Sequence, residues 1–211
     1  MHAVIVANAP WTWRPGHVVL ARDADLLLAA DGGANHLAGV GLRPAAVVGD
    51  LDSLRPSVRA WLGEDVMVPR PDQDYTDLEK TLGFAIDERG ATRVTVLAAT
   101  GGRPDHAFEN LALAARWGRR AAIELVGEDG RFVPVHERVE VPTRAGQLVS
   151  LLPLGRCERV WTRGLKWELD GEVLDPNRRI SVSNRATGCQ VMVRLEGGTL
   201  LVFLAEPEPG W

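Results

Sequence analysis

Short apolar segments alternate with helical patterns over the first 130 residues of the chain. Six apolar segments have the length and composition of β-strands, and they lie at residues 3–9, 25–31, 45–50, 65–70, 93–100 and 121–129. Apolar residues are nearly continuous within each segment, which is typical of parallel strands covered on both faces. The pattern therefore predicts a parallel α/β sheet.

Two of the intervening segments predict helices. Residues 76–90 repeat apolar side chains along one helical face and end at Gly90, which favours helix termination. Residues 104–118 begin with Pro104, which the first helical turn tolerates, and end at a glycine. Residues 8–22 carry no motif that predicts a structure or a role.

The pattern changes from about residue 132. Six short strand-like segments follow, separated by Gly, Pro, Asn and Asp, and they lie at residues 131–141, 147–154, 159–169, 179–184, 189–195 and 199–206. No helical pattern separates them, which predicts a small antiparallel sandwich or barrel. We therefore expect two domains, at residues 1–131 and 132–211.

Composition narrows the classes of partner. The chain has 24 Lys and Arg against 28 Asp and Glu, a net charge of −4, with no basic block, so no nucleic-acid partner is expected. No apolar run reaches about 18 residues and the N-terminal residues do not resemble a signal peptide. We expect no membrane association and a cytoplasmic location. Cys157 and Cys189 have neither the spacing of a zinc site nor that of a disulfide framework.

Aspartates follow four successive strands of the predicted sheet. They are Asp31 after the second strand, Asp50 and Asp52 after the third, Asp72, Asp74 and Asp77 after the fourth, and Asp105 after the fifth. Ligands of open α/β sheets bind at the carboxyl ends of the strands. A single aspartate at such a position is usually a turn or capping residue. The whole set, gathered at one edge, favours a site for Mg²⁺ and phosphate groups.

Phosphate groups would need further donors, and neither a P-loop nor a GxGxxG fingerprint is present. The glycine pairs 32–33 and 101–102 each follow a strand, where main-chain N–H groups can approach an anion. Arg103 strengthens the second pair, because a guanidinium matches phosphate oxygens. Thr76 and Glu79 form a capping box. Asp77 and Lys80 share one helical face, either as a surface ion pair or as ligands of metal and phosphate.

Six motifs resemble those of one family, the thiamine pyrophosphokinases, in the same order along nearly the whole chain. The motifs are DGGAN (31–35), GDLDS (49–53), DQDYTDLEK (72–80), GGRPDH (101–106), TRGLKWEL (162–169) and SVSN (181–184). The resemblance implies a Rossmann-like α/β domain followed by a small antiparallel β-sandwich domain for thiamine binding and dimerisation. It also implies a homodimer with the active site at the subunit interface, and transfer of pyrophosphate from ATP to the hydroxyl of thiamine, with AMP as the other product.

The resemblance also implies roles for individual residues. Metal ligands are expected at Asp50, Asp52 and Asp77, and these three would act in catalysis together with Arg103 and Asp105. ATP is expected to contact Asp31, Gly32, Gly33, Asn35, Gln73, Thr76, Lys80, Gly101, Gly102 and Arg103. Thiamine is expected to contact Trp167, Ser183, Asn184 and Asp105. A tryptophan in a small β-domain is more often a core residue, but the face of an indole also attracts flat cations such as thiamine.

Three alternatives fit parts of the pattern. A related pyrophosphokinase would use a hydroxymethylpterin as the acceptor. The DLDS segment also resembles the nucleophile loop of a phosphatase, with Asp50 as the nucleophile, although that loop normally follows the first strand. A non-catalytic nucleotide sensor would use the same cleft and bind ATP without consuming it. Thiamine pyrophosphokinase activity, with Mg²⁺ as cofactor and ATP as co-substrate, is the reading that uses all six motifs.

Overall fold

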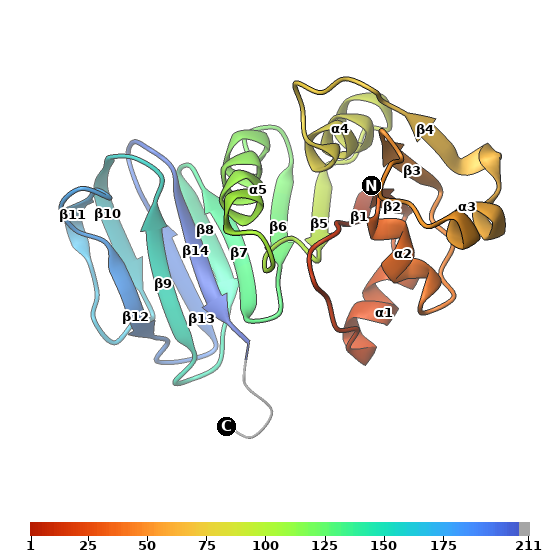
Figure 1. Ribbon diagram of the computed structural model, residues 1–211. Coiled ribbons are helices and arrows are strands. Elements are labelled where there is room, and N and C mark those ends of the chain that lie inside the picture. Colours follow the sequence, from red (N-terminus) through yellow and green to blue (C-terminus); the bar gives the residue numbers. More distant parts are fainter. Residues whose placement is uncertain (207–211) are drawn as a thin grey trace. The chain divides into compact units, whose positions relative to one another are not determined.

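The computed structural model describes residues 1–206, which form two compact units (Figure 1). The first unit contains Met1–Leu113 and Arg120–Glu128. Among the described residues, the second contains Ala114–Arg119 and residues 129–206. The main division therefore lies between residues 128 and 129, and the sequence pattern predicts it between residues 131 and 132.

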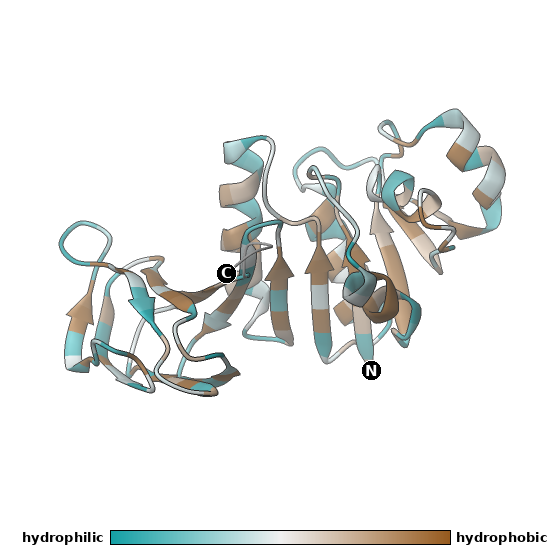
Figure 2. Ribbon diagram, turned by 90° about the horizontal axis from the view of Figure 1, so that it is seen from below, coloured by the Kyte–Doolittle hydropathy of each residue, from teal (hydrophilic) through white to brown (hydrophobic). Residues whose placement is uncertain are grey.

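The first unit is built on a parallel sheet with the strand order β6-β5-β1-β2-β3-β4. The strands are β1 (His2–Val6), β2 (Leu26–Ala30), β3 (Ala46–Gly49), β4 (Met67–Pro69), β5 (Arg93–Leu97) and β6 (Ala122–Val126). Most of their residues are apolar and, outside β4, buried, and Figure 2 shows much of these strands in brown. The predicted α/β class is confirmed, because buried parallel strands need apolar side chains on both faces.

Helices connect these strands. They are α1 (Pro15–Arg22), α2 (Gly33–Ala38), α3 (Pro56–Leu62), the short 3₁₀ helix η1 (Glu64–Val66), α4 (Asp77–Gly83), the π-helix η2 (Phe84–Glu88) and α5 (Pro104–Trp117). The two helices predicted from the sequence are present as α4 with η2 and as α5. Gly90 ends the first of them with φ of +74°. The sequence reasoning did not predict α1, α2 and α3, because these helices are only six to eight residues long.

The direction of the connections reverses beside β1. Successive connections move outward from β1 to β4, and the chain then returns to place β5 on the other side of β1. With right-handed crossovers, the helices before β4 cover one face of the sheet and α4 covers the other. This reversal opens a crevice at the carboxyl ends of β1 and β5, where open α/β sheets bind their ligands.

The second unit is an antiparallel sandwich in which the neighbouring strands β12-β9-β14-β7 pack on a separate four-stranded sheet with the order β11-β10-β13-β8. The strands are β7 (Gly130–Val135), β8 (Arg138–Pro142), β9 (Leu148–Pro153), β10 (Cys157–Arg163), β11 (Asp170–Leu174), β12 (Ser181–Arg185), β13 (Gln190–Arg194) and β14 (Leu200–Ala205). One apolar core joins the two sheets, for example Leu151 and Val202 with Val160 and Val193. The predicted β-sandwich is confirmed.

Eight strands form this unit within the described residues, whereas the sequence pattern predicts six. Residues 131–141 form two strands, β7 and β8, which belong to different sheets. Residues 159–169 form the end of β10 and a turn, and β11 begins at Asp170. The first error arises because the corner between β7 and β8 interrupts the strand pattern for only two residues. The second arises because Leu165, Trp167 and Leu169 alternate with polar residues as in a strand, although residues 164–169 form the turn. Within residues 1–206, no helix is both long enough and apolar enough to cross a membrane.

Candidate active site

A cleft of about 610 Å³ opens at the carboxyl ends of the parallel strands of the first unit. Residues that follow five of the six strands line it. They include Asn8 after β1, Asp31 after β2, Asp50 after β3, Gln73 and Lys80 after β4, and Arg103 after β5. The parallel sheet therefore brings together side chains that are far apart in the sequence.

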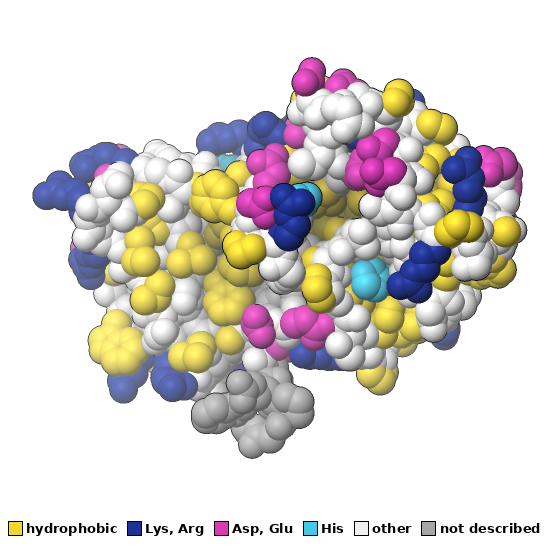
Figure 3. Space-filling view, viewed as in Figure 1, with side chains coloured by type: hydrophobic (Ala, Val, Ile, Leu, Met, Phe, Trp, Pro, Cys, Tyr) yellow, Lys and Arg dark blue, Asp and Glu magenta, His cyan; other side chains and the backbone are white. Residues whose placement is uncertain are grey.

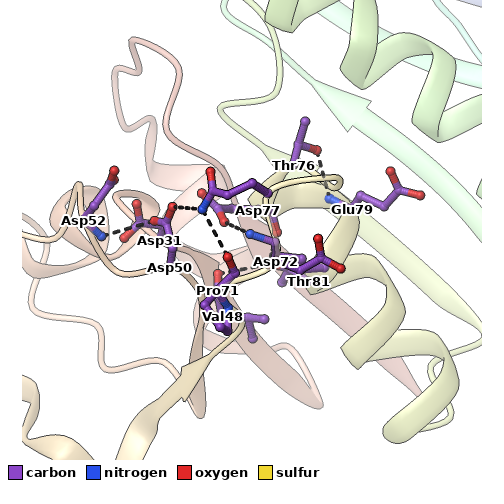
Figure 4. A network of polar contacts seen from close by, with 12 residues as sticks. Asp31, Val48, Asp50, Asp52, Pro71, Asp72, Thr76, Asp77, Glu79 and Thr81 are labelled. Atoms are coloured by element: carbon purple, nitrogen blue, oxygen red, sulfur yellow. Dashed lines mark hydrogen bonds and ion pairs between the residues drawn. The ribbon is translucent and has the colours of Figure 1, made fainter.

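Three carboxylates converge in this cleft. Asp31, Asp50 and Asp77 each offer one oxygen, and these oxygens lie within 4.8 Å of one another. Figure 4 shows the group, with acids from three different connections pointing toward one place. The Asp31 side chain is buried, and its Oδ2 accepts a hydrogen bond from the Ser53 main-chain N–H at 3.0 Å. Its Oδ1 is buried and has no hydrogen-bond partner.

A buried carboxylate oxygen without a partner is costly unless something else satisfies it. Oxygen atoms from three carboxylates suit a hard divalent cation such as Mg²⁺. The residues present therefore fit a magnesium site, with Asp31 as its most buried member.

The electrostatics of the three acids differ. Burial raises the pKa of Asp31, and the nearby carboxylate of Asp77 raises it further. A hydrogen bond from the Gln73 amide to Asp50 Oδ2, at 3.1 Å, lowers the pKa of Asp50. Lys80 Nζ lies 3.0 Å from Asp77 Oδ1, and only 7% of the Lys80 side chain is exposed. One ammonium thus compensates a part of the negative charge.

Local structure places Asp77 in the cluster. The Thr76 hydroxyl caps α4 by accepting a hydrogen bond from the Glu79 main-chain N–H at 3.3 Å, so the helix begins at Asp77. The predicted N-cap is therefore present. Asp31 and Leu51, which follow β2 and β3, have φ values of +40° and +67°. Such values are unfavourable for residues other than glycine and cluster at functional sites.

Asp52 lies outside the group of three. Its main-chain N–H donates to Asp50 Oδ1 at 3.3 Å, and its own carboxylate accepts a hydrogen bond from the Ser53 hydroxyl at 2.9 Å. Asp52 is exposed. The structure thus groups Asp31, which the sequence reasoning gave to ATP, with two of the three predicted metal ligands, and the metal role of Asp52 stays a prediction.

Arg103 and Asp105 pair with each other at the N-terminus of α5. The guanidinium donates two hydrogen bonds to the carboxylate, at 2.5 and 3.2 Å, and both side chains are exposed. This pairing lowers the pKa of Asp105 to about 2. Arg103, Gly101 and Gly102 line the cleft, while Asp105 does not belong to its lining.

Two residues that are predicted to contact ATP also have structural roles. The Asn35 side chain donates to the Ser53 carbonyl at 2.9 Å and accepts from the Arg55 main-chain N–H at 3.0 Å, so it fixes the loop after β3. A Cβ at Gly33 would lie 1.9 Å from the Val6 carbonyl oxygen, so Gly33 permits close packing of α2 on β1. Neither Asn35 nor Gly33 belongs to the lining of the cleft.

The second unit carries the other predicted site residues on one turn and one strand. Trp167 lies in the turn after β10, and 56% of its surface is exposed. Lys166 Nζ lies 4.8 Å from the centre of the indole ring. Ser183 is exposed on β12, whereas its neighbour Asn184 is buried. Trp167 is therefore not a core residue, and its ring is available to a flat ligand.

Comparison with known proteins agrees with both units. Residues 18–126 match the family model described as thiamin pyrophosphokinase, catalytic domain. Residues 136–200 match the model described as thiamin pyrophosphokinase, vitamin B1 binding domain. The first match alone covers more than half of the chain. The chain belongs to the thiamin pyrophosphokinase family.

Individual relatives support this assignment. Thiamine pyrophosphokinase 1 of Oryza sativa subsp. japonica is 29% identical over 217 residues, which covers 87% of this chain and 79% of the relative. Thiamin pyrophosphokinase 1 of Caenorhabditis elegans is 27% identical and covers 78% of this chain and 71% of its own length. The protein is therefore a thiamine pyrophosphokinase by family, and an enzyme.

Solved structures share the fold over the whole chain. Thiamin pyrophosphokinase from Geobacillus thermodenitrificans superposes with a TM-score of 0.86 at 25% identity and covers 100% of both chains. The thiamine pyrophosphokinase structure from Bacillus subtilis gives a TM-score of 0.88 at 20% identity and covers 99% of this chain and 100% of its own. The latter likeness shows the fold alone.

The thiamin pyrophosphokinase motifs contain most of the polar residues of the cleft. Ser53, Tyr75 and His106 lie within these motifs and line the cleft, although the sequence reasoning gave them no role. Asn8 and Asn110 also line the cleft and lie outside the motifs. Asn8 lies two residues after the end of β1, but the sequence pattern predicts a strand over residues 3–9, so Asn8 falls within the predicted strand and not at its carboxyl end. No sequence signal marks Asn110, which lies in the second turn of α5 and donates to the Ala99 carbonyl at 2.7 Å.

Proposed function

We propose that this protein transfers the pyrophosphoryl group of ATP to the hydroxyl of thiamine, giving thiamine diphosphate and AMP. One observation carries the proposal: three convergent carboxylates, one with a buried and unpartnered oxygen, share a cleft with basic side chains. A cleft of this kind suits a polyphosphate together with a divalent cation. Figure 3 shows acidic side chains in several separate groups on one face of the molecule.

Asp31, Asp50 and Asp77 would hold Mg²⁺, with Asp52 as a further candidate. When bound, Mg²⁺ supplies charge neutralisation and a template for the phosphate oxygens. Asp50 is prepared for this role, because the hydrogen bond from Gln73 keeps its carboxylate ionised. Asp31 gains most from a cation, since its charged form is penalised by burial in the free protein.

The transfer step is an in-line displacement at the β-phosphorus. A bond forms between the thiamine oxygen and the β-phosphorus, while the bond from that phosphorus to the oxygen bridging the α-phosphorus breaks, and this oxygen leaves on AMP. Lys80 and Arg103 would neutralise charge on the transferred group and on AMP. The hydroxyl proton passes to a carboxylate, for which Asp77 and Asp105 are the candidates. Pairing with Arg103 lowers the pKa of Asp105 to about 2, which makes it a weak base for this purpose.

Thiamine would stack on Trp167, with Ser183 at the edge of the same pocket. An exposed indole attracts a flat cation through cation–π and stacking contacts. We also propose the homodimer, with the thiamine pocket contributed by the partner subunit. Three apolar side chains of the second unit are exposed and support such a subunit interface, namely Leu148, Ile180 and Val182.

Other readings have less support. The hydroxymethylpterin acceptor stays a second candidate, because the cleft of the first unit would serve both acceptors equally. The phosphatase requires Asp50 as a free nucleophile, but both of its oxygens already accept hydrogen bonds, from Asp52 and Gln73. A non-catalytic nucleotide sensor would not need the exposed ring of Trp167. The cytoplasmic location stays a proposal, and the two free cysteines, Cys157 and Cys189, agree with a reducing compartment.

Release of AMP from ATP tests the proposal directly. The purified protein is incubated with ATP and Mg²⁺, with thiamine, with a hydroxymethylpterin, or without any acceptor. AMP formed only in the presence of thiamine supports the proposed function. AMP formed only with the pterin would show that the acceptor is a hydroxymethylpterin and not thiamine. Free phosphate without an acceptor would identify a phosphatase, and binding of ATP without any product would identify a sensor.

A further inference from the structure

Trp167 lies at the exposed tip of the turn between β10 and β11, yet both of its main-chain polar groups are engaged. Its N–H donates to Asn184 Oδ1 at 3.2 Å, and its carbonyl accepts from Asn184 Nδ2 at 2.7 Å. One side-chain amide therefore holds the main chain of Trp167 from both sides. The ring itself remains 56% exposed.

Asn184 has little left to offer a ligand. Only 2% of the residue is exposed, and its Oδ1 also accepts the Arg185 main-chain N–H at 2.8 Å. Two donors converge on this oxygen, which uses both of its lone pairs. These contacts also fix the orientation of the amide, because its NH₂ group in place of the oxygen would face two N–H donors.

The side chain of Glu168 stabilises the same turn through hydrogen bonds to its other residues. Glu168 Oε1 accepts the Leu165 main-chain N–H at 3.0 Å, and Oε2 accepts the hydroxyl of Thr162 at 2.5 Å. That hydroxyl oxygen in turn accepts the Leu169 main-chain N–H at 2.8 Å. Thr162 is fully buried, so this bracket closes the base of the turn that carries Trp167.

The main chain ties the turn to the end of β12. Lys166 donates its N–H to the Arg185 carbonyl at 2.8 Å, and Thr187 donates to the Gly164 carbonyl at 2.8 Å. Gly164 has φ of +90°, and a Cβ there would lie 2.3 Å from the Gln190 carbonyl oxygen. Glycine is therefore required where the turn leaves β10.

An irregularity in β12 turns Asn184 toward the turn. The register against β9 shifts between Ser181 and Asn184, and Ser183 has φ of +58°. Bulges of this kind redirect side chains. Here the bulge leaves Ser183 exposed while Asn184 is buried under Trp167, so adjacent residues of one motif face different environments.

We infer that Asn184 and Glu168 are positioning residues that hold the Trp167 ring ready for the acceptor, and that Asn184 does not itself contact thiamine. The inference rests on the proposed function, because it takes Trp167 as the stacking platform. A platform on an unbraced turn would lose conformational freedom on binding, and bracing removes that cost before the ligand arrives. It revises the role that the sequence reasoning gave Asn184, from ligand contact to support of Trp167.

A double-mutant cycle tests this inference. Thiamine KM, ATP KM and kcat are measured for Asn184→Ala, Trp167→Ala and the double variant. We expect Asn184→Ala to raise thiamine KM by about fivefold or more, the size of a lost stacking contact, with ATP KM unchanged. In the Trp167→Ala background the same substitution should add almost nothing. Fully additive effects would mean that Asn184 contacts thiamine independently, and would overturn the inference.

Variants of Glu168 provide an independent test if Asn184→Ala fails to fold. Glu168→Gln keeps an oxygen for Leu165 and a polar group for Thr162, and it should retain a thiamine KM near that of the wild type. Glu168→Ala removes both contacts and should raise thiamine KM in wild-type protein but not in the Trp167→Ala background. Equal KM values for all Glu168 variants would overturn the bracing role.

Asn177→Ala is the matched control, because Asn177 is an exposed asparagine of the same unit away from the turn. It should leave every kinetic constant unchanged. The wild-type reaction with thiamine is measured first, and absence of AMP at that stage would refute the proposed function. AMP formation with additive effects in the cycle would refute only the positioning role.

Discussion

Gly49 lies directly against the carboxylate of Asp77. A Cβ built on Gly49 would be 2.9 Å from Asp77 Oδ1 and 2.9 Å from the Cβ of Asp31. Atoms this close cannot coexist without displacement, so the absence of a side chain at the end of β3 lets the acids from β2 and α4 approach each other. The glycine of the GDLDS motif thus has a steric role in the acidic site, which its neighbours in the motif do not reveal.

Gly49→Ala should therefore separate Asp31 from Asp77. We expect a loss of about 1–3 kcal/mol in the free energy of unfolding from overpacking, together with a weaker stabilisation by Mg²⁺. Chemical denaturation with and without Mg²⁺ measures both effects. Gly16→Ala is the control, because no atom lies within 4 Å of a Cβ at Gly16. Because Gly16 lies in α1, this substitution should stabilise the fold by up to about 1 kcal/mol and leave the Mg²⁺ response unchanged. An unchanged Mg²⁺ response in Gly49→Ala would contradict the steric role.

Asp31→Asn should stabilise the protein at neutral pH in the absence of divalent cations. The folded-state pKa of Asp31 is raised above its ordinary value of 3.8, so the folded state holds the proton more tightly than the unfolded state. Stability from this group is therefore present below pH 3.8 and falls as the pH rises through the folded-state pKa. Asparagine carries no charge and lacks this loss.

The measurement is urea denaturation of both proteins between pH 4 and pH 7 in the presence of a chelator. The difference in unfolding free energy should grow with pH in favour of Asp31→Asn. Addition of Mg²⁺ should stabilise the wild type and should have a much smaller effect on the variant. A constant difference across this pH range would show that the Asp31 carboxylate is not penalised by burial.

Asp50→Asn and Asp52→Asn separate the two acids of one motif. Because Asp50 belongs to the group of three and Asp52 does not, we expect Asp50→Asn to raise the Mg²⁺ concentration needed for half-maximal turnover more than Asp52→Asn. Both variants should lose turnover with unfolding free energies within about 0.5 kcal/mol of wild type, since neither acid is in the core. Turnover titrated with Mg²⁺ at saturating ATP measures this concentration. A larger increase for Asp52→Asn than for Asp50→Asn would contradict a metal site built on Asp31, Asp50 and Asp77.

Trp167→Ala should raise thiamine KM and leave ATP KM nearly unchanged. The indole contributes stacking and cation–π attraction worth about 0.5–2 kcal/mol, which corresponds to a factor of about 2 to 30 in binding. The thiamine KM of Trp167→Phe should lie between those of the wild type and Trp167→Ala, because phenylalanine retains a smaller aromatic face. Steady-state kinetics with each substrate varied in turn measures the effect. A selective change in ATP KM would assign Trp167 to the nucleotide instead.

Two asparagines that were predicted to contact ligands also have structural contacts. Asn35 and Asn184 both stand in motifs that resemble the family, and sequence reasoning treated both as ligand residues. In the structure each amide binds main-chain groups of a loop: Asn35 fixes the loop after β3 and Asn184 fixes the turn of Trp167. A pattern of residues cannot separate a side chain that binds a ligand from one that orients its neighbour.

The sequence by itself determined the two units, the parallel sheet, the sandwich and the edge at which the acids gather, because periodicity and the residues that follow a strand are local properties of the chain. It also determined the start of α4, since the capping hydrogen bond joins Thr76 to Glu79, which is only three positions away. The tertiary structure alone decided which acids meet. Asp31 and Asp77 are 46 positions apart, and their approach depends on the strand order, on the missing side chain of Gly49 and on the burial of Asp31. Such packing depends on groups brought together from different strands, which no local pattern records.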